Sequence, residues 1–237
     1  MRWVKDRTGR FSLRPHYVPE ELDSECEKFI TDFLLQRHRR IEYPISTDDL
    51  TVLIETLTDD LDLYADLLNE DGNVEGVTDF FPGRRPKVKI SKQLTLDPRL
   101  NNRLRTTLTH ELGHVKLHTF MFDGQSTGFL LTPSAAAISH KCRRDNMLQA
   151  ALTDWMEWQA GFACGALLMP ATALRATVRR FLEDQQIAVG RFEVKSTEAQ
   201  SLITAVSSTY AVSREASRVR LLEQGVLTEA VLPAALF

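Results

Sequence analysis

The chain has 237 residues, 43% of them hydrophobic and 26% charged, and its formal net charge at pH 7 is −3. This length and composition predict a soluble globular protein with one main domain, and they give no overall bias toward nucleic acid. A run of about 20 apolar residues is absent, which excludes a membrane span, and the first residues lack the apolar stretch of a secretory signal. Three cysteines without disulfide-like spacing, Cys26, Cys142 and Cys164, indicate a reducing compartment, so we expect a cytoplasmic protein.

Residues 1–19 are basic and are interrupted by glycine and proline. They predict an N-terminal arm that could pair, dock or stay loose. A helix is expected from Pro19 onward, because proline and the acidic residues after it suit a first helical turn. A second helix is expected over residues 47–57, with Ser46 or Thr47 as its cap.

Residues 58–73 are rich in aspartate, but the ordered Asp-x-Asp-x-Asp-Gly calcium loop with its closing glutamate is absent. We therefore expect a solvated helix or loop there. Two strands follow at residues 74–81 and 87–91, and they predict an antiparallel hairpin in which Val88 and Ile90 face the core. The second strand is the expected sheet edge, where an extended peptide could add through backbone hydrogen bonds.

The sequence His-Glu-Leu-Gly-His at residues 110–114 lies in an apolar-periodic segment, 104–120, that predicts a helix with one face in the core. A helix turns about 100° per residue, so His110 and His114 share a face and can reach the same metal ion. A catalytic zinc site takes three protein ligands and leaves one position for water, so a third ligand is needed elsewhere. Glu111 lies off the line of the histidines and could take a proton from water. The alternative is a helix with two half-buried polar histidines.

His118 continues the series of histidines, but its Cα lies about 12 Å along the helix axis from that of His110. One ion cannot easily be held by both, so we expect His118 beside a ligand or at the edge of the core. A better third ligand is Glu157, a lone carboxylate between Trp155 and Trp158 in an apolar helix, because a buried charge needs a counter-charge. The alternative is a glutamate that faces solvent.

Residues 157–170 read Glu-Trp-Gln-Ala-Gly-Phe-Ala-Cys-Gly-Ala-Leu-Leu-Met-Pro. Together with the His-Glu-Leu-Gly-His sequence, this run resembles the ImmA/IrrE zinc metallopeptidases, and the resemblance covers residues 45–225. It implies a zincin-like fold and a protein substrate, a helix-turn-helix repressor of the XRE type. It also implies a bound Zn²⁺ with three ligands, His110, His114 and Glu157.

Two features depart from that family. The family usually has asparagine or aspartate four residues after the ligand glutamate, where this chain has Gly161, so Asp154 is the expected substitute in supporting the ligands. The glutamate follows the second histidine by 43 positions, which indicates an insertion over residues 123–153. Within it, His-Lys-Cys at 140–142 could bind a second metal, but no further cysteine or histidine pair lies nearby, so a polar loop is expected.

Residues 198–210 and 213–223 predict two helices around a tight turn, a length and layout similar to a helix-turn-helix. The second helix carries three arginines that could meet DNA phosphates. Its glutamates and apolar positions instead favour packing on the main domain. DNA binding is therefore possible but not favoured.

Together these patterns predict an α+β fold with a zincin-like core, made of a small antiparallel sheet and active-site helices. We expect an arm at residues 1–19, a metallopeptidase domain at 20–175 and a helical C-terminal module at 176–237. The expected protein is a zinc endopeptidase in which Glu111 activates water and Tyr210 or an arginine could stabilise the oxyanion. Two alternatives keep the fold without proteolysis: a DNA-binding regulator, and a toxin or partner-binding component of a two-gene module.

Overall fold

The computed structural model describes residues 1–68, 73–122, 138–143, 154–188 and 190–229, and for 138–143 it describes the backbone only. The described helices are α1 (Pro19–His38), α2 (Thr47–Glu55), α3 (Lys92–Leu96), α4 (Asn101–His118), α5 (Trp155–Leu168), α6 (Ala171–Asp184), α7 (Thr197–Tyr210) and α8 (Arg214–Glu223). The strands are β1 (Arg2–Lys5), β2 (Leu13–His16), β3 (Asp60–Ala65), β4 (Val74–Phe81), β5 (Arg84–Ser91), β6 (Ile138–Arg143), β7 (Phe192–Glu193) and β8 (Leu227–Thr228).

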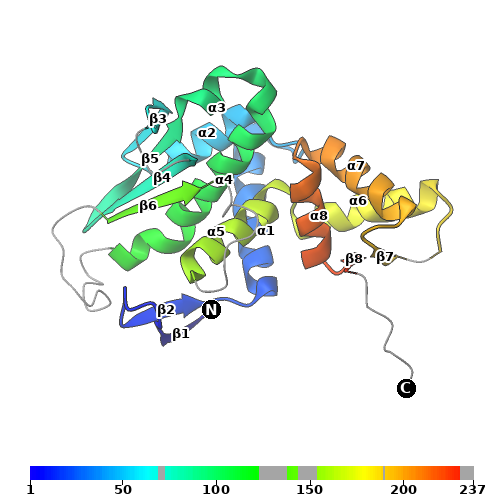
Figure 1. The fold of residues 1–237 in the computed structure, drawn as a ribbon, viewed down its shortest axis with the longest axis horizontal. Coiled ribbons are helices and arrows are strands. Elements are labelled where there is room, and N and C mark those ends of the chain that lie inside the picture. The colour runs from blue at the N-terminus through cyan, green and yellow to red at the C-terminus, as the bar shows by residue number, and fades with distance from the viewer. Residues whose placement is uncertain (69–72, 123–137, 144–153, 189, 230–237) are drawn as a thin grey trace.

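These elements form a mixed α+β protein, as predicted (Figure 1). Most of the insertion predicted at residues 123–153 lies outside the described residues. Within the described part, no single helix is both long and apolar enough to cross a bilayer; α5 and α6 pass that test only as a pair bent by 55°.

Four strands form the central sheet, in the order β3-β5-β4-β6. The predicted hairpin is confirmed, because β4 and β5 pair antiparallel and both Val88 and Ile90 are buried. The predicted small antiparallel sheet holds for β4 with β5 and β6, but β3 pairs with β5 in parallel. The expected edge strand was wrong: β5 lies between β3 and β4, and β6 covers the other side of β4. Sheet edges depend on pairing between distant segments, which the local pattern does not encode.

Two segments that were not expected to contain strands do contain them. The aspartate-rich stretch contains β3, in which Asp60, Asp62 and Tyr64 are exposed while the leucines between them are half-buried. This alternation is the period of a strand with one face covered, and it was overlooked because of the negative charge. Residues 140–142, predicted as a polar loop, belong to β6, where residue 141 pairs with Val77 of β4.

The N-terminal arm folds into a hairpin, β1–β2, that docks beneath α5 (Figure 1). Asp6 closes the hairpin by accepting hydrogen bonds from the backbone N–H of Thr8 and of Phe11, both at 3.0 Å. The same carboxylate accepts from Trp155 Nε1 of α5 at 3.1 Å. Phe11 is 2% exposed and packs edge-on against Trp155 and Phe122. One aspartate thus both shapes the hairpin and fastens it to α5.

Helices α4 and α5 pack closely at the centre of the molecule (Figure 1). A Cβ at Gly113 would lie 3.0 Å from both the Cα and the carbonyl oxygen of Ala160. Glycine at this position therefore lets the two backbones approach each other. Leu108 and Leu112 of α4 are fully buried in the main core. The close approach brings side chains from the two helices within reach of one another.

The C-terminal helices α7 and α8 form at the predicted positions and lie with α6 at one end of the molecule (Figure 1). Arg220 of α8 is fully buried, pairs with Asp23 of α1 at 2.5 Å and donates to the Met169 carbonyl at 3.1 Å. Arg105 of α4 is 2% exposed and donates to three backbone carbonyls, those of Ile45, Tyr210 and Ala211. Two buried guanidinium groups thus join these helices to the rest of the chain.

Candidate metal centre

Three side chains from α4 and α5 meet at one point. His110 Nε2 and His114 Nε2 are 3.1 Å apart, and the two carboxylate oxygens of Glu157 lie 3.2 Å from one histidine and 3.2 Å from the other. Donor atoms at about 2.0–2.1 Å from a tetrahedral zinc ion stand about 3.3 Å from one another. The observed spacing is close to that value. The group His110, His114 and Glu157 could therefore hold a metal ion.

The centre is buried and rich in negative charge. His110, Glu111 and His114 are fully buried, and Glu157 is 6% exposed. With neutral imidazoles, the two carboxylates leave two negative charges in a place from which water is largely excluded, which is costly without a counter-charge. A divalent cation would neutralise both. In the described residues, His110 Nδ1 and Glu111 Oε1 also lack hydrogen-bond partners. The donor set and its charge thus fit a bound divalent ion.

The pKa values of the cluster point the same way. Burial lowers the pKa of His114, but the Glu157 carboxylate and then Glu111 raise it, and the net pKa is above the ordinary histidine value. Burial raises the pKa of Glu157, but His114 and His110 lower it further, and the net pKa is below the ordinary value. The cluster therefore attracts positive charge, as either a proton or a metal ion. Because the two compete for the same ligand atoms, acid should displace the metal.

A chain of hydrogen bonds determines which nitrogen of His114 faces the centre. Gln159 Nε2 donates to the Pro15 carbonyl at 3.0 Å, so its Oε1 accepts from His118 Nε2 at 3.1 Å. The Nδ1 of neutral His118 is then an acceptor for the His114 Nδ1–H, at 3.1 Å. The lone pair of His114 Nε2 then lies on the side that faces Glu157, 3.2 Å from its carboxylate. His118 thus lies beside a candidate ligand, as the helix spacing predicted, and Gln159 orients both rings.

The start of α5 is held by Asp154. Its carboxylate accepts from the backbone N–H of Met156 at 3.1 Å and of Glu157 at 3.5 Å, as an N-cap does. It also pairs with Arg10 of the hairpin at 2.6 Å. Asp154 was expected to support the ligand side chains themselves. Its hydrogen bonds go instead to backbone N–H groups and to Arg10, so in the described residues it caps α5 and ties it to the hairpin.

Glu111 points from α4 toward β4. Its Oε2 accepts a hydrogen bond from the Thr78 hydroxyl, while no partner of Oε1 is found in the described residues. Burial raises the pKa of Glu111 above its ordinary value, against the lowering effect of the two nearby histidines. A carboxylate with a raised pKa takes up a proton more readily than an ordinary glutamate, as a general base must.

Gly76 of β4 leaves room for this carboxylate. A Cβ at position 76 would lie 2.8 Å from Glu111 Cδ, and the strand cannot easily withdraw because β5 and β6 pair with it on both sides. We expect Gly76→Ala to displace Glu111 and to lower the free energy of unfolding by about 1–3 kcal/mol, measured by urea denaturation. Metal binding should persist, since none of the three candidate ligands touches this position. Gly190→Ala is the control, because its Cβ would meet only Leu182, at 3.6 Å, and an unchanged stability of Gly76→Ala would contradict the packing described here.

Sequence reasoning missed Gly76, Thr78 and Gln159. Glycine within a strand pattern is a known sign of close backbone approach, so Gly76 carried a usable signal. The other two are recognisable only once the strands and the hairpin are placed. Tyr210, considered as an oxyanion donor, is 1% exposed and its hydroxyl lies 3.0 Å from Thr177 Oγ1 on α6.

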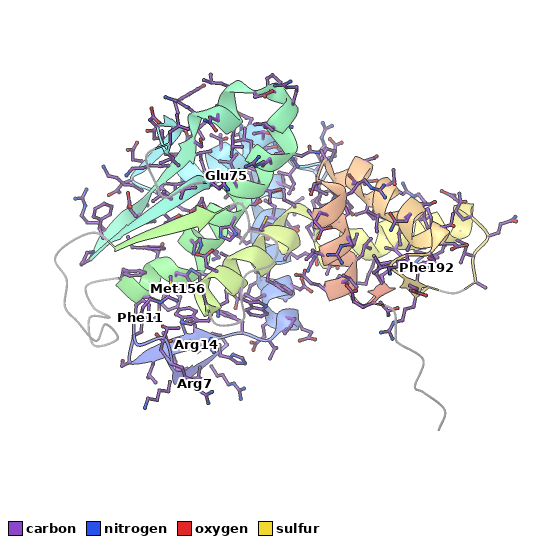
Figure 2. The ribbon with its side chains drawn as sticks, viewed as in Figure 1. Arg7, Phe11, Arg14, Glu75, Met156 and Phe192 are labelled. Carbon is purple, nitrogen blue, oxygen red and sulfur yellow. The ribbon has the colours of Figure 1, made fainter. Side chains whose placement is uncertain are left out.

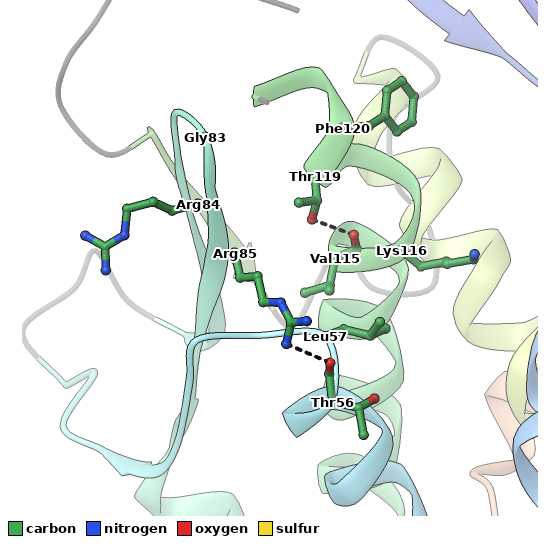
Figure 3. Close-up of a pocket in the computed structure, with 9 residues that line it drawn as sticks. All are labelled: Thr56, Leu57, Gly83, Arg84, Arg85, Val115, Lys116, Thr119 and Phe120. Atoms are coloured by element: carbon green, nitrogen blue, oxygen red, sulfur yellow. Dashed lines mark hydrogen bonds between the residues drawn. The ribbon is translucent and has the colours of Figure 1, made fainter. Parts of the chain in front are cut away.

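A separate cavity of about 500 Å³ lies between the β4–β5 turn and the end of α4 (Figure 3). Arg85 crosses it and donates to the Thr56 carbonyl at 3.1 Å. None of the three candidate ligands lines it. Its lining residues are Thr56, Leu57, Gly83, Arg84, Arg85, Val115, Lys116, Thr119 and Phe120.

Comparison of the chain with protein-family models gave no match, and comparison with curated proteins gave no significant match. Its function is therefore inferred from the residues of the centre and their geometry.

Proposed function

We propose that the chain is a zinc-dependent endopeptidase with a zincin-like core. The observation that carries this proposal is the buried group of His110, His114 and Glu157 with the Glu111 carboxylate beside it. Two imidazoles and one carboxylate are a ligand set that catalytic zinc commonly takes in peptidases. A purely structural site would need no base next to it. The resemblance of the two sequence motifs to ImmA/IrrE metallopeptidases supports the same activity.

Zinc, when bound, would act as a Lewis acid on the peptide carbonyl and on water. Glu111 takes a proton from the attacking water as the new carbon–oxygen bond forms, and it passes that proton to the leaving amine as the carbon–nitrogen bond breaks. The Thr78 hydroxyl holds one oxygen of the carboxylate, which leaves Oε1 for the water. Glu157, whose pKa is lowered, stays ionised throughout.

The substrate we propose is a helix-turn-helix repressor of the XRE type, cleaved in the cytoplasm. The family resemblance supports this substrate class, and the buried free thiols of Cys26 and Cys164 suit a reducing compartment. The contacts of α8 speak against DNA reading, since Arg218 pairs with Glu215 and Arg220 is fully buried. The helix-turn-helix-like layout of α7 and α8 then serves packing.

Removal of the metal tests this function. We expect the zinc-loaded chain to cut a candidate repressor into discrete fragments, visible on a denaturing gel. Chelation should abolish the fragments and added zinc should restore them, whereas magnesium, which prefers oxygen ligands, should not. A chain that binds one zinc ion but cuts no repressor would favour the partner-binding alternative. A chain that takes up no zinc would refute the metal centre itself.

A further inference from the structure

A cleft of about 700 Å³ lies between the N-terminal hairpin and the start of α5. Figure 2 shows Arg7 and Arg14 on the hairpin beneath this helix. The charged side chains that line the cleft are four cations and one carboxylate: Arg2, Lys5, Arg7, Arg14 and Asp6. The lining is therefore strongly positive, although the chain as a whole is negative.

The one carboxylate in the cleft is already engaged. Asp6 accepts hydrogen bonds from the hairpin backbone and from the Trp155 indole. Burial raises the pKa of Asp6, but the hydrogen bonds from Thr8 and Phe11 lower it further, and the net pKa is below the ordinary value. In the part of the chain that the structure describes, Arg2, Lys5 and Arg7 form no ion pair with any carboxylate. Their positive charge is therefore uncompensated and available to a ligand.

One residue, Trp155, connects the cleft with the surroundings of the metal centre. Trp155 forms its wall and lies two positions before Glu157 on the first turn of α5. The Trp155 ring also meets the His118 ring edge-on, with centroids 5.4 Å apart. A chain segment bound in the cleft would thus contact Trp155, whose ring touches His118, the neighbour of the candidate ligand His114.

We propose that this cleft binds an acidic peptide segment, one that presents aspartate or glutamate side chains to Arg2, Lys5, Arg7 and Arg14. The inference rests on the proposed function where it takes this segment to be part of the substrate. Single-stranded nucleic acid fits less well, because such strands bind by stacking bases on exposed aromatic faces. Trp155 is only 4% exposed, and the Arg14 guanidinium lies 5.6 Å from the centre of its ring.

Binding can be measured without cleavage in the full-length Glu111→Gln chain, by fluorescence anisotropy of a labelled peptide rich in aspartate and glutamate. The triple variant Arg2→Gln/Lys5→Gln/Arg7→Gln should bind about tenfold more weakly, since each exposed ion pair contributes a factor of up to about five. The affinity should also fall as salt is raised. The same peptide with asparagine and glutamine in place of its acidic residues should not bind.

The matched control is Arg179→Gln/Arg180→Gln/Arg191→Gln, which removes the same charge from exposed positions on α6 and after it. This control should bind the acidic peptide as tightly as the parent chain. An equal loss of peptide affinity in both triple variants would show that the peptide responds to the overall positive charge rather than to the cleft. That result would overturn the proposal. A single-stranded oligonucleotide of the same length that binds more tightly than the peptide would overturn it in favour of nucleic acid.

Two further measurements separate this proposal from the proposed function. Peptide binding should survive chelation, because none of the cleft residues is a candidate ligand. If cleavage occurs, the triple variant should raise KM for an acidic substrate about tenfold and leave kcat unchanged, whereas loss of kcat would contradict a binding role. If no cleavage occurs in any chain, the anisotropy result still decides whether the cleft binds acidic peptide.

Discussion

Glu111→Gln should retain its metal and lose about 10²- to 10⁴-fold in the rate of peptide cleavage, the range that general-base catalysis supplies. The amide keeps the shape of the carboxylate and can still accept a hydrogen bond from Thr78, so the fold should be undisturbed. It cannot accept a proton from water. Metal content by mass spectrometry of the native protein and single-turnover cleavage rates together test this separation.

The acid–base role of Glu111 also predicts a pH profile. Because the carboxylate form is the active one, the cleavage rate should rise with pH as Glu111 loses its proton. Burial raises the pKa of this carboxyl in the metal-free protein, and a bound divalent cation would lower it. Thr78→Val removes the hydrogen bond that lowers this pKa, so the rising limb should move to higher pH. A Glu111→Gln chain that cleaves at the parental rate would exclude Glu111 as the base.

Glu157→Gln should bind zinc more than about 100-fold more weakly, because loss of a direct ligand should exceed the 10- to 100-fold effect of outer partners. A neutral amide is a poor zinc ligand, and of the two described carboxylates at the centre it leaves only that of Glu111. Competition with a chromophoric chelator measures the affinity. Glu183→Gln, at an exposed position on α6, is the control and should bind as the parent does. A Glu157→Gln chain with full affinity would show that the ion is held elsewhere.

The same carboxylate predicts how the metal-free protein responds to pH. The lowered pKa of Glu157 contributes stability that is present above its ordinary value of 4.5 and is lost as the pH falls through the folded value. The raised pKa of His114 contributes stability that is present below 6.5 and is lost as the pH rises through the folded value. The free energy of unfolding of the metal-free protein should thus gain most from Glu157 and His114 between pH 4.5 and 6.5. The melting temperatures of the metal-free parent and of metal-free Glu157→Gln should approach each other as the pH falls below 4.5.

The helices were the predictable part of this fold. Each long helix shows apolar residues at helical spacing, and local signals such as Pro19 and Ser46 place the starts correctly. The spacing of His110 and His114 predicted their common face, because that geometry depends only on the helix they share. The position of Glu157 required a second helix, and the sequence indicated it through a charge in an apolar stretch.

The parts that could not be predicted depend on contacts between distant segments. The pairing of β5 with β3 on one side and β4 on the other follows from the packing of the whole sheet. The docking of the hairpin on α5 depends on Asp6 meeting Trp155, residues 149 positions apart. The orientation of His114 likewise requires Gln159 to reach the Pro15 carbonyl. Nothing local in any of these segments specifies its partner.

The carbonyl contacts of Arg105 bear on how this protein can be divided. Two of its three acceptors, the carbonyls of Tyr210 and Ala211, come from the end of α7 and the residue after it. Arg105 itself lies five residues before His110 on α4. In a protein that ended at residue 175, the charged guanidinium of Arg105 would lose two of its three acceptors and would lie at the new surface. Helix α4, which supplies two of the candidate ligands, would be less firmly held. Residues 176–237 therefore stabilise α4. Removing them would destabilise the remaining part of the protein, which contains the candidate metal ligands.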